Sequence, residues 1–193
     1  MSRNILFISV QNIKERTSLH ANIDEKLILP EILTCQDMFM LPALGSALYN
    51  RIQDGIVANN LNANEITLLD TYLAPTLVYF VMSEMPQALS YQFYNKGLLR
   101  KSGENTENPS MQDMIDVANR YKSRAEFYKQ RMIKYLKEYS TLYPEYLNPG
   151  SGIDAIHPEN DAYTTSVWLG DFDCCAGKSF EELYQGNRGC SDC

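Results

Sequence analysis

The sequence predicts a mainly α-helical protein: a small helical bundle around one long C-terminal helix, followed by an extended irregular C-terminal arm. Residues 109–139 contain the longest helical pattern in the chain, and neither Gly nor Pro interrupts it before Pro144. After Pro144, prolines and glycines recur and the sequence becomes acidic. We therefore divide the 193 residues into a helical domain, 1–143, and an acidic arm, 144–193.

The long helix is predicted to begin after Ser110, whose hydroxyl can accept a free backbone N–H, with Asp113 completing a capping box. Apolar and aromatic side chains then recur at heptad spacing. They are Met111, Met114, Ala118, Tyr121, Ala125, Tyr128, Met132, Tyr135 and Tyr139. This spacing places them along one side of a helix, so we expect the earlier helices to pack against them.

The other side of this helix is predicted to be basic. Its six cations are Arg120, Lys122, Arg124, Lys129, Arg131 and Lys134. A run of charge on a helix is often only a solvated surface. The alternative is a surface that contacts DNA in a channel or an acidic patch on a partner protein.

Two further helical segments are predicted between a helix that opens at residues 22–25 and the long helix. One enters through Pro42 and continues past Gly45, where we expect a second backbone to pass close by. The other covers residues 66–95, is capped by Asn62, and is interrupted by two prolines. Its apolar centre indicates the most buried turn of the domain.

The formal charge of −7 is unevenly distributed along the chain. Residues 1–95 carry 5 basic and 9 acidic groups, a net charge of −4. Residues 96–137 carry 10 basic and 5 acidic groups, a net charge of +5. Residues 138–193 carry 2 basic and 10 acidic groups, a net charge of −8. A basic middle and an acidic end predict contact between the two, within a chain or between copies. The apolar runs are too short for an export signal or a membrane span, so we expect a soluble protein made in a reducing cytoplasm.

The acidic arm also carries aromatic side chains of the kinds that anchor protein interfaces. They are Tyr163, Trp168, Phe172, Phe180 and Tyr184. Its prolines and glycines disfavour a second packed core, yet its aromatic content is high for a plain disordered tail. We expect the arm to dock on a neighbouring subunit and to order as it binds.

No catalytic or cofactor site is predicted. The two histidines, His20 and His157, lie beside no nucleophile motif, and no glycine-rich phosphate loop is present. The spacing of Cys190 and Cys193 matches half of a zinc site, to which Cys174, Cys175 and His157 are the remaining candidates. Free thiols are the favoured interpretation, with Cys35 as a core residue, and we expect neither a structural metal nor an enzyme.

Three features together resemble a known family: the helix entry Leu41-Pro-Ala-Leu-Gly-Ser-Ala-Leu-Tyr, the proline-interrupted apolar helix, and the last helix rich in Arg, Lys and Tyr. They resemble the head–tail connector (adaptor or ring) proteins of tailed bacteriophages, with the crAss-like phages as the suggested group. The resemblance covers about residues 20–140 and rests on element order, without an invariant motif.

The resemblance implies a structural virion protein at the head–tail junction, assembled in the host cytoplasm. It implies a homo-oligomeric ring, dodecameric in the usual case, bound to the portal protein and to adjacent tail or ring proteins. Genomic DNA would pass through its lumen without sequence-specific contact. The alternative is a nucleic-acid-binding helical protein that uses the basic side of residues 110–139.

Overall fold

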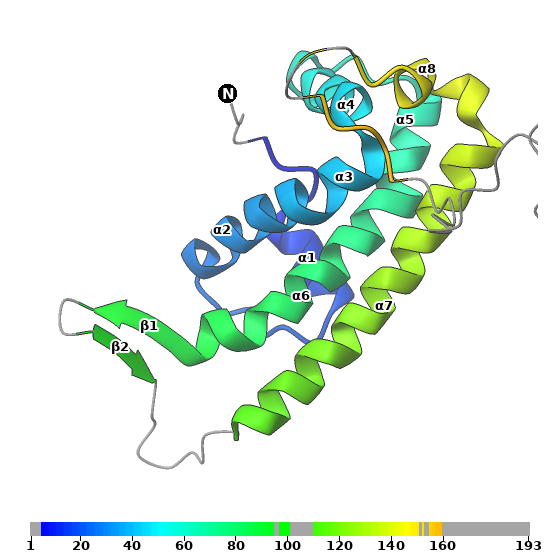
Figure 1. Cartoon of the computed structure of the whole chain (residues 1–193). Helices are drawn as coiled ribbons and strands as arrows, with labels where there is room; N and C mark the ends of the chain where they lie inside the picture. The colour runs from blue at the N-terminus through cyan, green and yellow to red at the C-terminus, as the bar shows by residue number, and fades with distance from the viewer. Residues whose placement is uncertain (1–4, 95–96, 101–109, 151, 153–154, 160–193) are drawn as a thin grey trace, which may run out of the picture. The chain divides into compact units, whose positions relative to one another are not determined.

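A computed structural model describes residues 5–94, 97–100, 110–150, 152 and 155–159 (Figure 1). It confirms the predicted fold class: short helices pack around one long helix, α7 (Met111–Glu138), of 28 residues. At about 1.5 Å per residue, this helix is roughly 42 Å long. The chain divides into two compact units, residues 1–159 and 160–193. The boundary therefore falls later than the predicted one after residue 143, and the second unit lies outside the described residues.

Two long helical runs precede α7, and each contains a wide π-helical segment. The first run comprises α2 (Glu25–Cys35), η1 (Gln36–Met40) and α3 (Leu41–Leu44). The second comprises α5 (Ala63–Thr67), η2 (Leu68–Leu73) and α6 (Ala74–Ser90). Each wide segment ends two residues before a proline, Pro42 or Pro75. Because proline lacks an N–H and its ring collides with the carbonyl one turn earlier, widening the preceding turn keeps each run continuous.

The shorter elements complete the fold. They are α1 (Val10–Arg16), α4 (Ser46–Ala58), the antiparallel hairpin of β1 (Tyr91–Tyr94) and β2 (Gly97–Arg100), η3 (Ser140–Leu142) and α8 (Pro144–Leu147). The predicted helix over residues 66–95 is thus wrong at its end, because α6 stops at Ser90. Tyr91, Phe93 and Tyr94 are aromatic residues that favour strands over helices.

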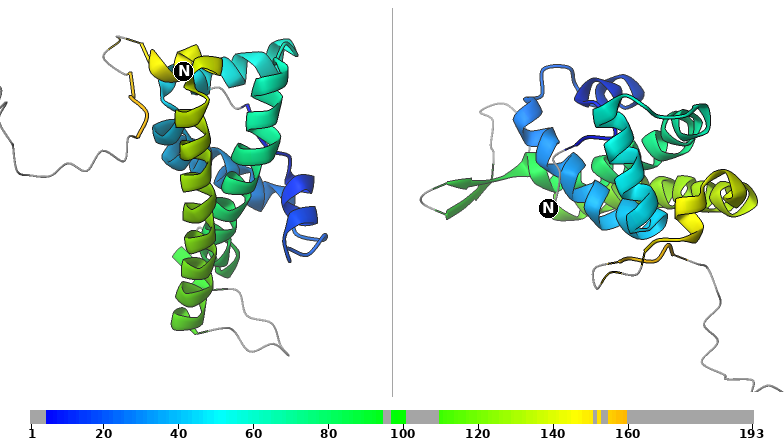
Figure 2. Two further views of the ribbon diagram at one scale, coloured as in Figure 1. Left: turned by 90° about the vertical axis from the view of Figure 1, so that its right-hand side faces the viewer. Right: turned by 90° about the horizontal axis from the view of Figure 1, so that it is seen from above.

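Helices α6 and α7 run antiparallel along most of their length and form the most extensive contact in the molecule (Figures 1 and 2). Leu77, Phe80 and Val81 of α6 are fully buried, as are Ala125 and Met132 of α7. The predicted apolar stripe is therefore confirmed along the middle of α7. It is wrong at both ends, where Met111 is 55% exposed and Tyr139 is 48% exposed.

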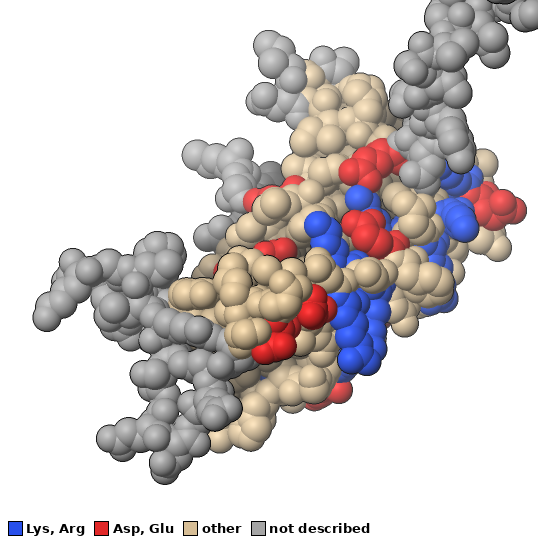
Figure 3. Space-filling model, turned by 60° about the horizontal axis from the view of Figure 1, so that its bottom comes forward, with Lys and Arg blue, Asp and Glu red and all other residues tan. Residues whose placement is uncertain are grey.

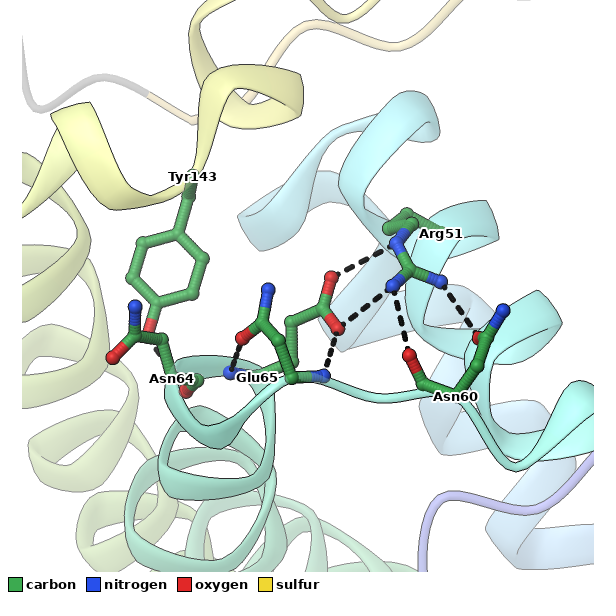
Figure 4. A network of polar contacts seen from close by, with 6 residues as sticks. Arg51, Asn60, Asn64, Glu65 and Tyr143 are labelled. Carbon is green, nitrogen blue, oxygen red and sulfur yellow. Dashed lines mark hydrogen bonds and ion pairs between the residues drawn. The ribbon is translucent and has the colours of Figure 1, made fainter.

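A polar network fixes the end of the molecule where α5 begins (Figure 4). The buried carboxylate of Glu65 pairs with the Arg51 guanidinium at 2.9 Å and accepts the Asn62 N–H, so that the predicted capping box is confirmed. The Tyr143 hydroxyl donates to the Asn64 carbonyl at 2.8 Å, and Tyr143 is 1% exposed. Tyr143, the last residue of the predicted helical domain, is therefore tied to the core.

Two helical stretches of the described chain, Glu25–Leu44 and Ala63–Ser90, are long and apolar enough by composition to cross a membrane. Core helices of soluble proteins satisfy the same test, and 39% of the apolar window of the first stretch and 56% of that of the second are buried inside this fold. Within the fold, α2 of the first stretch packs against α6 of the second, and α6 also packs against α7.

Candidate partner-binding surface on helix α7

The outward side of α7 carries an exposed row of four cations around one phenylalanine, which we name the basic–aromatic stripe. Its members are Arg120, Arg124, Phe127, Arg131 and Lys134. Their spacing of four, three, four and three residues places them on one side of a helix. Phe127 is 67% exposed, the largest value among the large apolar residues of this helix. Aromatic residues and Arg are both enriched at protein interfaces, so we treat the stripe as a candidate partner-binding surface.

The six cations predicted to share one basic surface are divided by the structure. Four belong to the stripe, whereas Lys122 is exposed about 200° around the helix from Arg120. The prediction is wrong for Lys129, which is buried and whose ammonium pairs with the Glu159 carboxylate at 2.6 Å. Figure 3 shows Lys and Arg side chains gathered on the side of the molecule that it faces, with acidic side chains near them.

Two arginines of the stripe are held by aromatic rings. The Arg131 guanidinium lies 5.0 Å from the centre of the Tyr72 ring, and the Arg124 guanidinium lies 5.6 Å from that of Tyr121. Guanidinium groups stack favourably on aromatic rings while their N–H donors remain available. The rings therefore fix these cations in position without neutralising them.

Behind the stripe, tyrosines from η2, α6 and α7 form a row that we name the tyrosine seam. Its members are Tyr72, Tyr79, Tyr121, Tyr128 and Tyr135. Tyr72 stacks on Tyr135 with ring centres 4.0 Å apart, and Tyr79 stacks on Tyr128 at 5.2 Å. All are half-buried, as expected where a ring packs inward and a hydroxyl stays at a wet edge.

The seam ends at Tyr143, whose hydroxyl lies 3.1 Å from that of Tyr135. Burial, and then the hydrogen bond with Tyr135, raise the pKa of Tyr143 well above its ordinary value. The Tyr143 hydroxyl therefore stays protonated near neutral pH and acts as a neutral hydrogen-bonding group at the end of the seam.

A surface hollow of about 400 Å³ opens where α1, α6 and α7 meet. Its floor is formed by Pro75 and Val78 of α6, and its aromatic wall by the stacked Tyr79 and Tyr128. Arg16 and Arg131 also line it. Arg131 thus belongs to both the hollow and the stripe, so the two features are continuous on the surface.

Residues 155–159 form a clamp against α4 and α7. The Ser46 N–H donates to the Ile156 carbonyl at 2.9 Å, the Ile156 N–H donates to the Ser46 hydroxyl at 2.8 Å, and the Glu159 N–H donates to the Pro42 carbonyl at 2.9 Å. The Lys129–Glu159 ion pair joins the same segment to α7. The first part of the predicted arm therefore packs on its own domain.

The expected close approach at Gly45 is confirmed, with one difference. Gly45 separates α3 from α4 instead of lying within a helix, and its φ of +77° is a conformation that favours glycine. A Cβ atom there would lie 2.8 Å from the Pro158 ring and 3.2 Å from the Ile156 carbonyl oxygen. The backbone that passes close to Gly45 is therefore that of the clamp, residues 155–159.

The described residues test few of the other predicted sites, namely Cys35 in the core, the possible zinc site and the arm aromatics. Cys35 is buried as predicted, and burial together with the nearby Glu84 and Glu31 raises its pKa to about 12, so its thiol stays protonated. Within the described ranges, no group of three His, Cys, Asp or Glu side chains could hold a metal ion. The four remaining cysteines and the arm aromatics Tyr163, Trp168, Phe172, Phe180 and Tyr184 lie outside them.

Sequence reasoning missed Phe127, Arg16 and Tyr79. Counting intervals of three and four from Arg120 would have found Phe127, because the cations and the ring share that register. Nothing in the sequence brings Arg16 to Arg131, since they are far apart in the chain and meet only when α1 folds against α6 and α7.

Searches of curated proteins and of solved structures each gave no significant match. One family model matches residues 40–156, which extend from the π-helical segment before α3 to the clamp and include all of α7. The matched region covers more than half of the chain. The chain therefore belongs to the DUF6712 family, a family of unknown function.

Proposed function

We propose that this protein is a structural subunit that assembles with copies of itself into a ring, as a head–tail connector of a tailed-phage virion does. The basic–aromatic stripe carries the proposal. It is an exposed cationic surface with Phe127 at its centre, whereas residues 160–193 of the same chain carry six acids against two bases and five aromatic residues. Opposite charge on two different segments of one chain favours head-to-tail contact, the kind of interface that closes into rings.

The rest of the connector role follows from the resemblance of about residues 20–140 to such proteins. The ring would sit between the portal protein and the adjacent tail or ring proteins and surround the DNA. Its subunits would have a structural role without a catalytic step. Cations of the stripe that remain uncovered by a neighbour would face DNA through their charge alone, without reading sequence.

Assembly of the full-length chain tests this proposal. Light scattering over a concentration series should show particles larger than one subunit, and Arg120→Glu or Phe127→Ser should raise the concentration needed for assembly by about fivefold or more. Lys122→Glu is the matched control, because it reverses one exposed charge on the same helix outside the stripe. Circular dichroism should show all three variants as helical as the wild type.

A second function, nucleic-acid binding, is favoured by the same four cations. It predicts a monomer that shifts duplex DNA with a steep salt dependence and loses that shift with Arg120→Glu. The ring proposal predicts weak, sequence-independent DNA binding that moderate salt abolishes. A wild-type chain that stays monomeric at every concentration while binding DNA at physiological salt would overturn the ring proposal.

A further inference from the structure

The hollow between α1, α6 and α7 combines features that suit an acidic aromatic ligand. The stacked rings of Tyr79 and Tyr128, 5.2 Å apart, form one wall, and the apolar Val78 and Pro75 form the floor. Its volume of about 400 Å³ lies within the range of ligand pockets, roughly 300–1,000 Å³. A single aromatic side chain can enter such a space and stack on its wall.

Two cations line the hollow. Arg16 is exposed at the end of α1 and Arg131 is exposed on α7. Among the described residues, no carboxylate pairs with either guanidinium, although Arg131 lies 5.0 Å from the Tyr72 ring. Two unpaired guanidiniums beside an aromatic wall select a ligand that offers carboxylates next to a ring.

The chain itself contains such a ligand at Trp168-Leu-Gly-Asp-Phe-Asp173. This segment holds two aromatic rings and two acids and contains no cation. The other acidic aromatic stretch, around Phe180, has Lys178 two residues before its ring, which would face the arginines unfavourably. Segment 168–173 therefore matches the hollow best in charge and chemistry.

We propose that the hollow receives residues 168–173 of a second copy of the chain, with an aromatic ring against Tyr79 and Tyr128 and the Asp171 and Asp173 carboxylates on Arg16 and Arg131. This proposal rests on the proposed ring function and names the contact that would join its subunits. Trp168 lies nine positions after Glu159, which is fixed by the clamp, so an extended connection could span up to about 30 Å. That length is of the order of a small domain and suffices to reach an adjacent copy.

Trp168 provides the measurement, because it is the only tryptophan in the chain. The receptor is the full-length chain carrying Trp168→Phe, which has no tryptophan. The probe is a peptide of residues 163–173, whose Trp168 is then the only tryptophan in the mixture. Titration should give a saturable blue shift of its emission, weakened about fivefold or more by Arg16→Ala or Arg131→Ala in the receptor. Lys122→Ala in the receptor is the control and should leave the titration unchanged.

Changes in the peptide separate the two components of recognition. Replacing both acids, Asp171→Asn with Asp173→Asn, should weaken binding about fivefold or more and remove most of its salt dependence. Phe172→Ala should weaken binding at all salt concentrations. A titration insensitive to both receptor arginines, or no blue shift at any concentration, would overturn the proposal.

Two further outcomes would also overturn it in defined ways. If a short single-stranded DNA bound through Arg16 and Arg131 while the peptide did not, the hollow would be a nucleic-acid site. If wild-type Trp168 emission at high dilution were already blue-shifted and reverted with Arg131→Ala, the segment would occupy the hollow of its own chain. Assembly that is sensitive to Phe127→Ser without peptide binding would refute this contact alone, and peptide binding without assembly would refute the ring.

Discussion

The two sides of α7 obey different constraints, although they share one backbone. The inner side holds fully buried Ala125, Met132 and Leu136 against the rest of the domain, so each position is fixed by packing. The outer side holds Phe127 and four cations in solvent, and only Arg124 and Arg131 among these cations stack on rings of the described fold. Substitutions on the inner side should therefore alter stability, and those on the outer side should alter association.

The sharpest test of this difference places two substitutions two residues apart on α7. Met132→Asp introduces an unpaired charge at a fully buried position and should lower the free energy of unfolding by about 4 kcal/mol or more. Lys134→Ala, on the exposed stripe, should change it by less than about 0.5 kcal/mol. Thermal melts followed by circular dichroism measure both, and equal stability of the two variants would contradict the assignment of the two sides.

A smaller effect is expected where the clamp crosses Gly45. Gly45→Ala should destabilise the domain by about 1–3 kcal/mol, because the positive φ is unfavourable for alanine and its Cβ would collide with Pro158. Gly152→Ala is the matched control, since nothing lies within 4 Å of a Cβ there. Chemical denaturation measures both variants. If Gly45→Ala were as stable as the wild type, the clamp would not be held as described.

The same clamp determines where the arm can be removed. Truncation at Pro144 would delete Tyr146, which is buried, together with the clamp, so it would damage the core. Truncation after Glu159 should leave melting nearly unchanged while abolishing assembly, because it removes only residues 160–193. A truncated chain that still assembled normally would show that the arm is dispensable.

The smallest effect concerns Glu31, on the opposite side of α6 from the stripe. Burial, and then the charge of Glu84, raise the pKa of Glu31. A raised folded pKa means that this group favours folding when protonated, and that its contribution is lost as pH rises through the folded pKa. Glu31→Gln should therefore increase stability at pH 7 by about 0.5 kcal/mol, since solvent screening limits the effect. It should also flatten the pH dependence of the melting temperature just above the ordinary glutamate pKa of about 4.3.

The matched variant is Glu84→Gln, which removes the neighbouring charge. It should act in the same direction, and the double variant should gain less than the sum of the two, because they remove one shared repulsion. Additive gains would show that the two carboxylates do not interact.

The sequence by itself determined the fold class, the capping boxes at Ser110 and Asn62, the burial of Cys35 and the buried apolar residues in the middle of α7. These features depend on residues close together in the chain, whose spacing fixes which helical side they share. The π-helical segments before Pro42 and Pro75 are partly of this kind, since a proline within a long apolar helix already indicates a local distortion.

Only the tertiary structure shows that Lys129 is buried, that residues 155–159 form the clamp and that Arg16 and Arg131 line one hollow. Lys129 follows the same local pattern as the exposed cations, and its burial depends on Glu159, thirty residues later in the chain. The hollow requires α1 to meet α6 and α7, so Arg16 acquires its neighbours only on folding. Local spacing determines which side of a helix a residue occupies, whereas the neighbours of that side are set by how distant segments pack.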